Sequence, residues 1–226
     1  MSTLMMKTDK EIQKDVMKEL DWDPQVDAVE VGVQVKDGLV TLTGTIGNYA
    51  KKLAAKRAAH RVTGVLDVVN NLSVELADLH KKSDQEVAKA VRHALEWDVL
   101  VPDTKIHSTV ANGYVTLDGQ LESWADKMAA EVALEHLAGV KGVINQIEVK
   151  PQMRIDSEKI RTAIESALER QAEREADRIG IKVQDGVVTL TGSVRSWTEK
   201  NAVHNVAAFT PGVRRIDDLL MVDSFS

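Results

Sequence analysis

The sequence contains no cysteine, only 4% aromatic residues and no run of more than four apolar residues. The absence of cysteine excludes disulfide bonds, thiolate metal ligands and a cysteine nucleophile. A membrane-spanning helix needs about 20 apolar residues, so none is predicted. The N-terminus lacks the basic start and apolar core of a secretory signal. With Met1 as the native start we therefore expect a cytoplasmic protein, and a periplasmic one if the native start lies elsewhere.

The composition is that of a folded, acidic protein. Apolar residues make up 43% and charged residues 28% of the 226 residues, which disfavours a disordered chain. Acidic residues outnumber basic ones by 35 to 29, giving a net charge of −6. Nucleic-acid binding depends on a basic surface, so we expect no nucleic-acid partner.

One motif occurs three times, as DGLVTLTG (37–44), NGYVTLDG (112–119) and DGVVTLTG (185–192). The motifs are 75 and then 73 residues apart, and a glycine followed by valine recurs 26 residues after each turn glycine. A fixed period indicates repeated structural units. We predict three domains, at about 4–79, 80–153 and 154–226. The motif glycines assigned structural roles are Gly38, Gly44, Gly64, Gly113, Gly119, Gly139, Gly186, Gly192 and Gly212.

Each unit begins with a segment that has apolar residues four positions apart. This spacing predicts an amphipathic helix, capped by Asp9, Ser83 or Ser157 in the three copies. The apolar positions are Ile12, Val16 and Leu20, then Val87, Val91 and Leu95, then Ile160, Ile164 and Leu168.

Two alternating runs around a two-residue turn follow this helix and predict a β-hairpin. In the first copy, the turn at 37–38 places Val35 opposite Val40 and Val33 opposite Leu42. In the second copy, the same register places Ser108 opposite Leu117, which weakens the apolar face there.

An alanine-rich helix and a final strand complete the unit. The helix of the first copy is expected to end at Gly64, and the strand to turn Val68, Leu72 and Val74 inward. We therefore predict an α+β fold of three tandem small αββαβ domains. Each is a three-stranded mixed sheet with two helices on one face, and a threonine-rich opposite face.

The motifs resemble those of the BON family, small bacterial domains named for osmotic-shock-protection and nodulation proteins. The resemblance rests on the turn glycine, the V-T-L-x-G pattern, an aromatic residue at the second helix, and a closing G-V-x-x-V-x-N-x-L-x-V. The closing pattern reads GVLDVVNNLSV (64–74), GVKGVINQIEV (139–149) and GVRRIDDLLMV (212–222), with Asp218 in place of the asparagine in the third copy.

The resemblance implies a non-catalytic binding module. It implies phospholipid binding in osmotic or envelope stress, and alternatively a cytosolic ion-responsive protein that senses potassium or binds a protein partner. The residues themselves show no catalytic motif, no metal-ligand spacing among the six histidines and no cofactor-binding motif. We therefore expect neither enzyme activity nor a metal or cofactor. The sequence leaves the oligomeric state open, a homo-oligomer included.

The second helix of the first unit is strongly basic. It has no acidic residue between Tyr49 and Leu66, and it could attract anionic headgroups at about 1 kcal/mol per basic residue. The alternatives are a solvated helix face and a contact with the acidic helix of another unit or chain. The candidate binding residues are Lys51, Lys52, Lys56, Arg57 and Arg61.

Four tryptophans stand out in a chain with so few aromatic residues. Trp124 and Trp197 align with Tyr49 and are expected to pack a helix start onto its sheet. Trp22 and Trp97 align with each other at the end of the first helix, where the third unit has Arg170. If exposed, they are candidate anchors for a membrane interface or a partner, the alternative being packing at the domain boundary.

Overall fold

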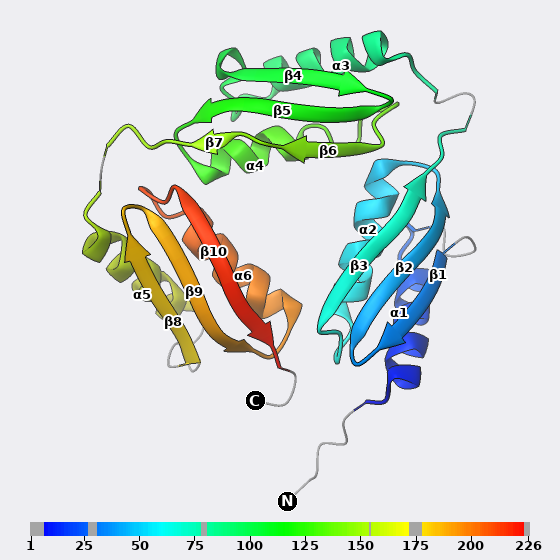
Figure 1. Ribbon diagram of the computed structural model, residues 1–226, viewed down its shortest axis with the longest axis horizontal. Helices are drawn as coiled ribbons and strands as arrows, with labels where there is room; N and C mark the ends of the chain where they lie inside the picture. Colours follow the sequence, from blue (N-terminus) through cyan, green and yellow to red (C-terminus); the bar gives the residue numbers. More distant parts are fainter. Residues whose placement is uncertain (1–6, 27–30, 78–80, 154, 172–177, 224–226) are drawn as a thin grey trace, which may run out of the picture. The chain divides into compact units, whose positions relative to one another are not determined.

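The computed structural model describes residues 7–26, 31–77, 81–153, 155–171 and 178–223. Within these ranges the predicted order of helix, strand, strand, helix, strand occurs three times, and each copy has its own sheet (Figure 1). We refer to the copies as repeats 1, 2 and 3. The α+β fold of three tandem units predicted from the sequence is confirmed.

Repeat 1 has a mixed sheet with the strand order β1-β2-β3. Strands β1 and β2 are antiparallel and pair Val35 with Val40 and Val33 with Leu42, as the sequence predicts. Strands β2 and β3 are parallel, and both helices cover one face of the sheet (Figure 1). The elements are α1 (Asp9–Trp22), β1 (Val31–Lys36), β2 (Leu39–Ile46), α2 (Tyr49–Arg61) and β3 (Asp67–Val74).

Repeat 2 has the same plan, but its last strand is divided. Both parts, β6 and β7, pair in parallel with β5, and Ser108 lies opposite Leu117 in the hairpin as expected. The elements are α3 (Asp84–Trp97), a short 3-10 helix η3 (Asp103–Lys105), β4 (Ile106–Ala111), β5 (Tyr114–Leu121), α4 (Trp124–Val132), β6 (Gly142–Asn145) and β7 (Glu148–Val149).

Repeat 3 has the strand order β10-β9-β8. Its elements are α5 (Ser157–Gln171), β8 (Ile179–Gln184), β9 (Val187–Val194), α6 (Trp197–Ala208) and β10 (Arg215–Val222).

The core of each repeat lies between its helices and its sheet. The nine apolar positions predicted for the first helices are at most 5% exposed, and Val68, Leu72 and Val74 of β3 are also buried. Burying one such aliphatic side chain contributes about 1.5–3 kcal/mol, which makes this layer the main source of stability.

The caps of the first helices differ from the prediction in two repeats. Ser83 caps α3 as expected, but the cap of α1 is Thr8, whose hydroxyl accepts a hydrogen bond from the Glu11 amide. In repeat 3, Asp156 accepts from the amide of Glu158, so the acid just before Ser157 has the capping role. Sequence spacing locates a helix start only to within about a residue, because several neighbouring side chains are suitable caps.

Asp9 instead clamps the hairpin turn of its repeat. Its two carboxylate oxygens accept hydrogen bonds from the amides of Asp37 and Gly38, at 2.9 and 3.0 Å. Asp84 binds the amides of Asn112 and Gly113 in the same way, at 2.8 and 2.9 Å. The clamp joins the start of the first helix to a turn that follows 28 residues later in the chain.

Replacing Asp84 with alanine is expected to lower the free energy of unfolding of repeat 2 by about 1–3 kcal/mol, because two hydrogen bonds to a charged group are lost and one amide is part-buried. Urea unfolding followed by circular dichroism measures the change. Asp118→Ala, which removes the same charge away from the turn, should cost less. Equal losses in the two variants would refute a stabilising clamp.

Candidate binding surface

Helix α2 of repeat 1 presents Lys56 and Arg57 on the side away from the core. Its start is fixed by Asn48, whose side-chain oxygen accepts a hydrogen bond from the Lys51 amide at 2.8 Å. Successive residues in a helix are about 100° apart, so a buried alanine stripe leaves Lys56 and Arg57 on the opposite side, and both are exposed. The stripe consists of Ala54, Ala55, Ala58 and Ala59.

The closing asparagine of the motif anchors this helix to the sheet. The Asn70 side chain donates to the Lys52 carbonyl at 2.8 Å, and Asn145 donates to the Lys127 carbonyl at 3.0 Å in repeat 2. Asp218 of repeat 3 has no amide to donate, and its carboxylate lies 3.4 Å from Nδ1 of His204. The amide donor of the motif is therefore absent at this position of repeat 3, where a carboxylate contacts His204 of α6.

Arg61 differs from the other predicted cations because acids already bind it. Its Nε lies 2.7 Å from Glu19 and its terminal nitrogen 2.7 Å from Asp23. The hydrogen bond from Arg61 holds the pKa of Asp23 below its usual value. Arg61 therefore ties α2 to α1, and its charge is largely balanced within the protein.

We call the remaining cations of α2 the basic face, and at about 100° per residue they are spread over a broad arc of the helix. They are Lys51, Lys52, Lys56 and Arg57. Lys51 and Lys52 are half-buried, and the other two are exposed. Among the described residues, the three lysines make no ion pair, whereas Arg57 does have an interaction partner. The basic face thus offers three lysine charges that no acid in the described ranges pairs with.

Trp22 and Trp97 are the most exposed tryptophans, with 85% and 84% of their surface accessible. In the sequence, Trp22 lies between Glu19 and Asp23, the two acids that bind Arg61 of α2. Trp97 is followed by the exposed Val99 and Leu100. Both indoles are exposed, which is the condition for interpreting them as anchors.

The other three aligned aromatic residues lie at the starts of the second helices. Tyr49 is buried, while Trp124 and Trp197 are half-buried. The amino groups of Lys127 and Lys200 lie 5.2 and 5.0 Å from the centres of the two indole rings, within range of a cation–π contact. That these residues pack a helix start onto its own sheet stays a prediction.

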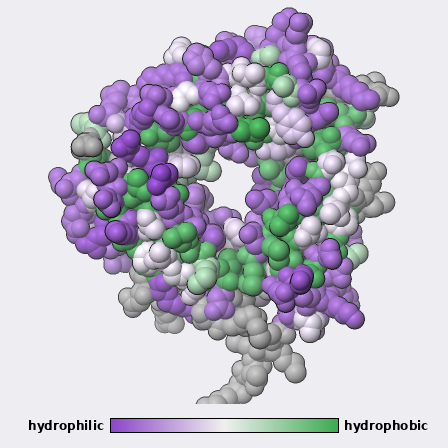
Figure 2. All heavy atoms as spheres, in the orientation of Figure 1, coloured by the Kyte–Doolittle hydropathy of each residue, from purple (hydrophilic) through white to green (hydrophobic). Residues whose placement is uncertain are grey.

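Hydrophobic residues interrupt a mostly hydrophilic surface in Figure 2. Several lie on the last strand of a repeat, which is an edge strand of its sheet. These exposed strand residues are Val69, Ile144, Leu219 and Met221.

The described residues contain no helix long and apolar enough to cross a membrane. In the same ranges, no three histidine, aspartate or glutamate side chains come together as a metal site.

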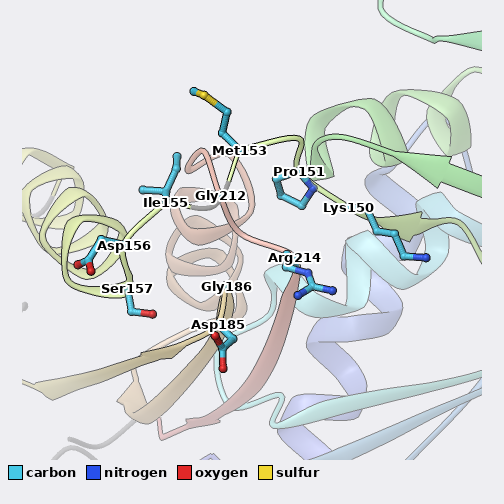
Figure 3. Close-up of a pocket in the computed structure, with 10 residues that line it drawn as sticks. All are labelled: Lys150, Pro151, Met153, Ile155, Asp156, Ser157, Asp185, Gly186, Gly212 and Arg214. Atoms are coloured by element: carbon cyan, nitrogen blue, oxygen red, sulfur yellow. The ribbon is translucent and has the colours of Figure 1, made fainter.

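A cavity of about 560 Å³ in repeat 3 was not predicted. Figure 3 shows that it is lined by the segment leading into α5, the turn between β8 and β9, and the loop before β10. The sequence of repeat 3 differs from the other repeats at this place. IDS (155–157) stands where repeats 1 and 2 have KTD (7–9) and KSD (82–84).

Comparison with known proteins identifies the repeated unit. The family model described as BON domain matches residues 8–75, 83–151 and 156–224. The chain is 26% identical over 129 residues to osmotically-inducible protein Y of Escherichia coli K12, a match that covers 55% of this chain and 64% of that protein. It is 25% identical over 123 residues to an uncharacterized protein in the gshII 5′ region of Anaplasma centrale, covering 53% and 82%.

The chain therefore spans less than two thirds of the length of the Escherichia coli relative. Among solved structures, the C-terminal domain of CdsD, a type III secretion protein of Chlamydia trachomatis, is 13% identical. That alignment covers 96% of this chain and all of that one, with a TM-score of 0.27.

Proposed function

Because this chain belongs to the BON domain family, with three copies of the domain, we propose that it acts by binding rather than by catalysis. The proposed ligand is an anionic phospholipid surface, and the proposed contact is the basic face of repeat 1. The similarity to an osmotically-inducible protein supports a role in osmotic or envelope stress.

The observation that carries this proposal is the set of lysines on α2 that no acid of the described residues pairs with. A basic residue near an anionic membrane contributes about 1 kcal/mol, so three lysines together supply about 3 kcal/mol. This corresponds to roughly a hundredfold preference for anionic over neutral vesicles. The exposed indole of Trp22 can add an interfacial contact.

Flotation of the purified chain with vesicles tests the proposal. We expect binding to vesicles that contain phosphatidylglycerol, weaker binding at near-physiological salt, and none to pure phosphatidylcholine. The salt effect follows from screening, since the Debye length falls to about 8 Å at 0.15 M ionic strength. Absence of flotation at low salt with anionic vesicles would exclude the lipid proposal.

Binding of a protein partner is the second candidate. It is supported by the exposed apolar residues on the edge strands, because an open strand edge can pair with another chain. Such a partner would bind in the absence of vesicles and would be insensitive to charge reversal on α2.

A further inference from the structure

The cavity of repeat 3 lies where repeats 1 and 2 bind a carboxylate. In those repeats, the turn amides of 37–38 and 112–113 donate to Asp9 and Asp84. Ser157 stands at this position in repeat 3, and among the described residues no hydrogen bond joins its side chain to the turn at Asp185 and Gly186. Its side chain is shorter than that of aspartate and carries no charge. The third copy therefore has a serine at the position where the other two have the carboxylate that binds the turn.

The turn itself keeps the same backbone geometry in all three repeats. Asp37, Asn112 and Asp185 have φ values of 51°, 54° and 50°, and the glycines that follow have values of 74°, 81° and 77°. The N–H groups of the third turn are thus presented as in the two turns that hold a carboxylate. Gly186 is buried and lines the cavity.

Arg214 supplies a positive charge beside this turn. Its backbone amide donates to the Gly186 carbonyl at 2.7 Å, and its side-chain stem packs against Gly186. The same position is Leu66 in repeat 1 and Lys141 in repeat 2, and each donates to its turn glycine in the same way. Repeat 3 therefore combines an arginine at this position with the loss of the first-helix carboxylate, an arrangement suited to an added oxyanion.

Two acids, Asp156 and Asp185, also line the cavity, and neither prevents an oxyanion from binding there. Asp156 accepts the amide of Glu158 and so serves as the cap of its own helix. Asp185 corresponds to Asp37 of repeat 1, whose presence does not prevent Asp9 from binding the turn there. Pro151, Met153 and Ile155 form an apolar part of the wall, and Lys150, which pairs with Glu148 at 2.7 Å, also lines the cavity (Figure 3).

We propose that this cavity binds a small organic carboxylate. Its carboxylate takes the place that the aspartate side chain has in the other repeats, accepting from the turn amide of Gly186 with Arg214 alongside. Its hydrocarbon portion contacts the apolar wall. The site is independent of the basic face, which lies on a different repeat, so either assignment can fail without the other.

Hexanoate is a suitable probe, with hexanamide as its uncharged counterpart. We expect hexanoate to shift the Gly186 amide resonance of the full chain saturably in heteronuclear NMR spectra, and hexanamide to leave it in place. Ser157→Asp should weaken hexanoate binding roughly tenfold or more, because the new carboxylate occupies the turn amides. Ser157→Asn fills the same space without a charge and should also weaken hexanoate binding. This variant distinguishes weakening by occupation of the site from weakening by charge repulsion.

Two substitutions at one aligned position complete the test. Arg214→Gln should reduce hexanoate binding, while Lys141→Gln should leave it unchanged, because Asp84 already occupies the turn of repeat 2. Unchanged resonances elsewhere in repeat 3 show that each variant is folded. The proposal is overturned if hexanoate produces no saturable shift at Gly186, or if Ser157→Asp and Ser157→Asn bind it as tightly as the original chain.

Discussion

Replacing Lys52, Lys56 and Arg57 with glutamate is expected to abolish flotation with anionic vesicles. Each lysine substitution removes an attraction of about 1 kcal/mol, and every glutamate introduces a repulsion of similar size, so the affinity should fall by more than roughly a hundredfold. The three residues are at least partly exposed, and the alanines that pack α2 onto the sheet are untouched, so the fold should be retained.

The matched control reverses the same number of charges elsewhere. Lys36, Lys89 and Lys182 are exposed and lie one in each repeat, so changing them to glutamate gives the same net charge without altering α2. Flotation should persist in this variant, with a modest reduction from the changed net charge. Equal losses in both variants would mean that overall charge, not the basic face, determines binding.

Replacing Gly119 with alanine is expected to unfold repeat 2 or to lower its free energy of unfolding by about 3 kcal/mol or more. Gly119 has a φ of 145°, a backbone conformation that side chains with a Cβ rarely adopt. A Cβ at this position would overlap the carbonyl oxygen of Lys105, a backbone atom that cannot move without disturbing the start of β4. The aligned Gly44 and Gly192 have φ values of 117° and 115°, which explains why the motif ends in glycine.

Amide hydrogen exchange on the full chain measures this effect repeat by repeat, with loss of protection expected in β4 and β5. Gly47→Ala is the control, because a Cβ there meets no atom within 4 Å. It should leave stability within about 0.5 kcal/mol of the original. Native protection of repeat 2 in the Gly119→Ala variant would show that the backbone there is less constrained than its geometry indicates.

The elements and their faces could be predicted from the sequence because they depend on local periodicity. A spacing of four placed Val16 and Val91 in the core, and a two-residue turn set the pairing of Val33 with Leu42. The helix caps were predicted less accurately, since Thr8 rather than Asp9 caps α1. Either residue can cap a helix, so the choice depends on what else each side chain can reach.

The candidate site could be predicted only in outline. The sequence showed that α2 is basic, but not that Arg61 is bound by Glu19 and Asp23, which precede it by 42 and 38 residues. It aligned Trp22 with Trp97 without determining that both are exposed. Ion pairs and exposure depend on which elements meet in space, and periodicity carries no such information.

The sequence by itself determined that this protein consists of three BON units, each with a defined hairpin register and an apolar face, because these features arise from hydrogen bonds and burial between nearby residues. Only the tertiary structure decided which cations are available to a ligand, and that Asp9 and Asp84 clamp a turn far along the chain. It also showed that Ser157, at the corresponding position of repeat 3, lines a cavity together with Arg214. The physical reason is that these properties depend on distances between side chains, which exist only once the helices have packed against their sheets.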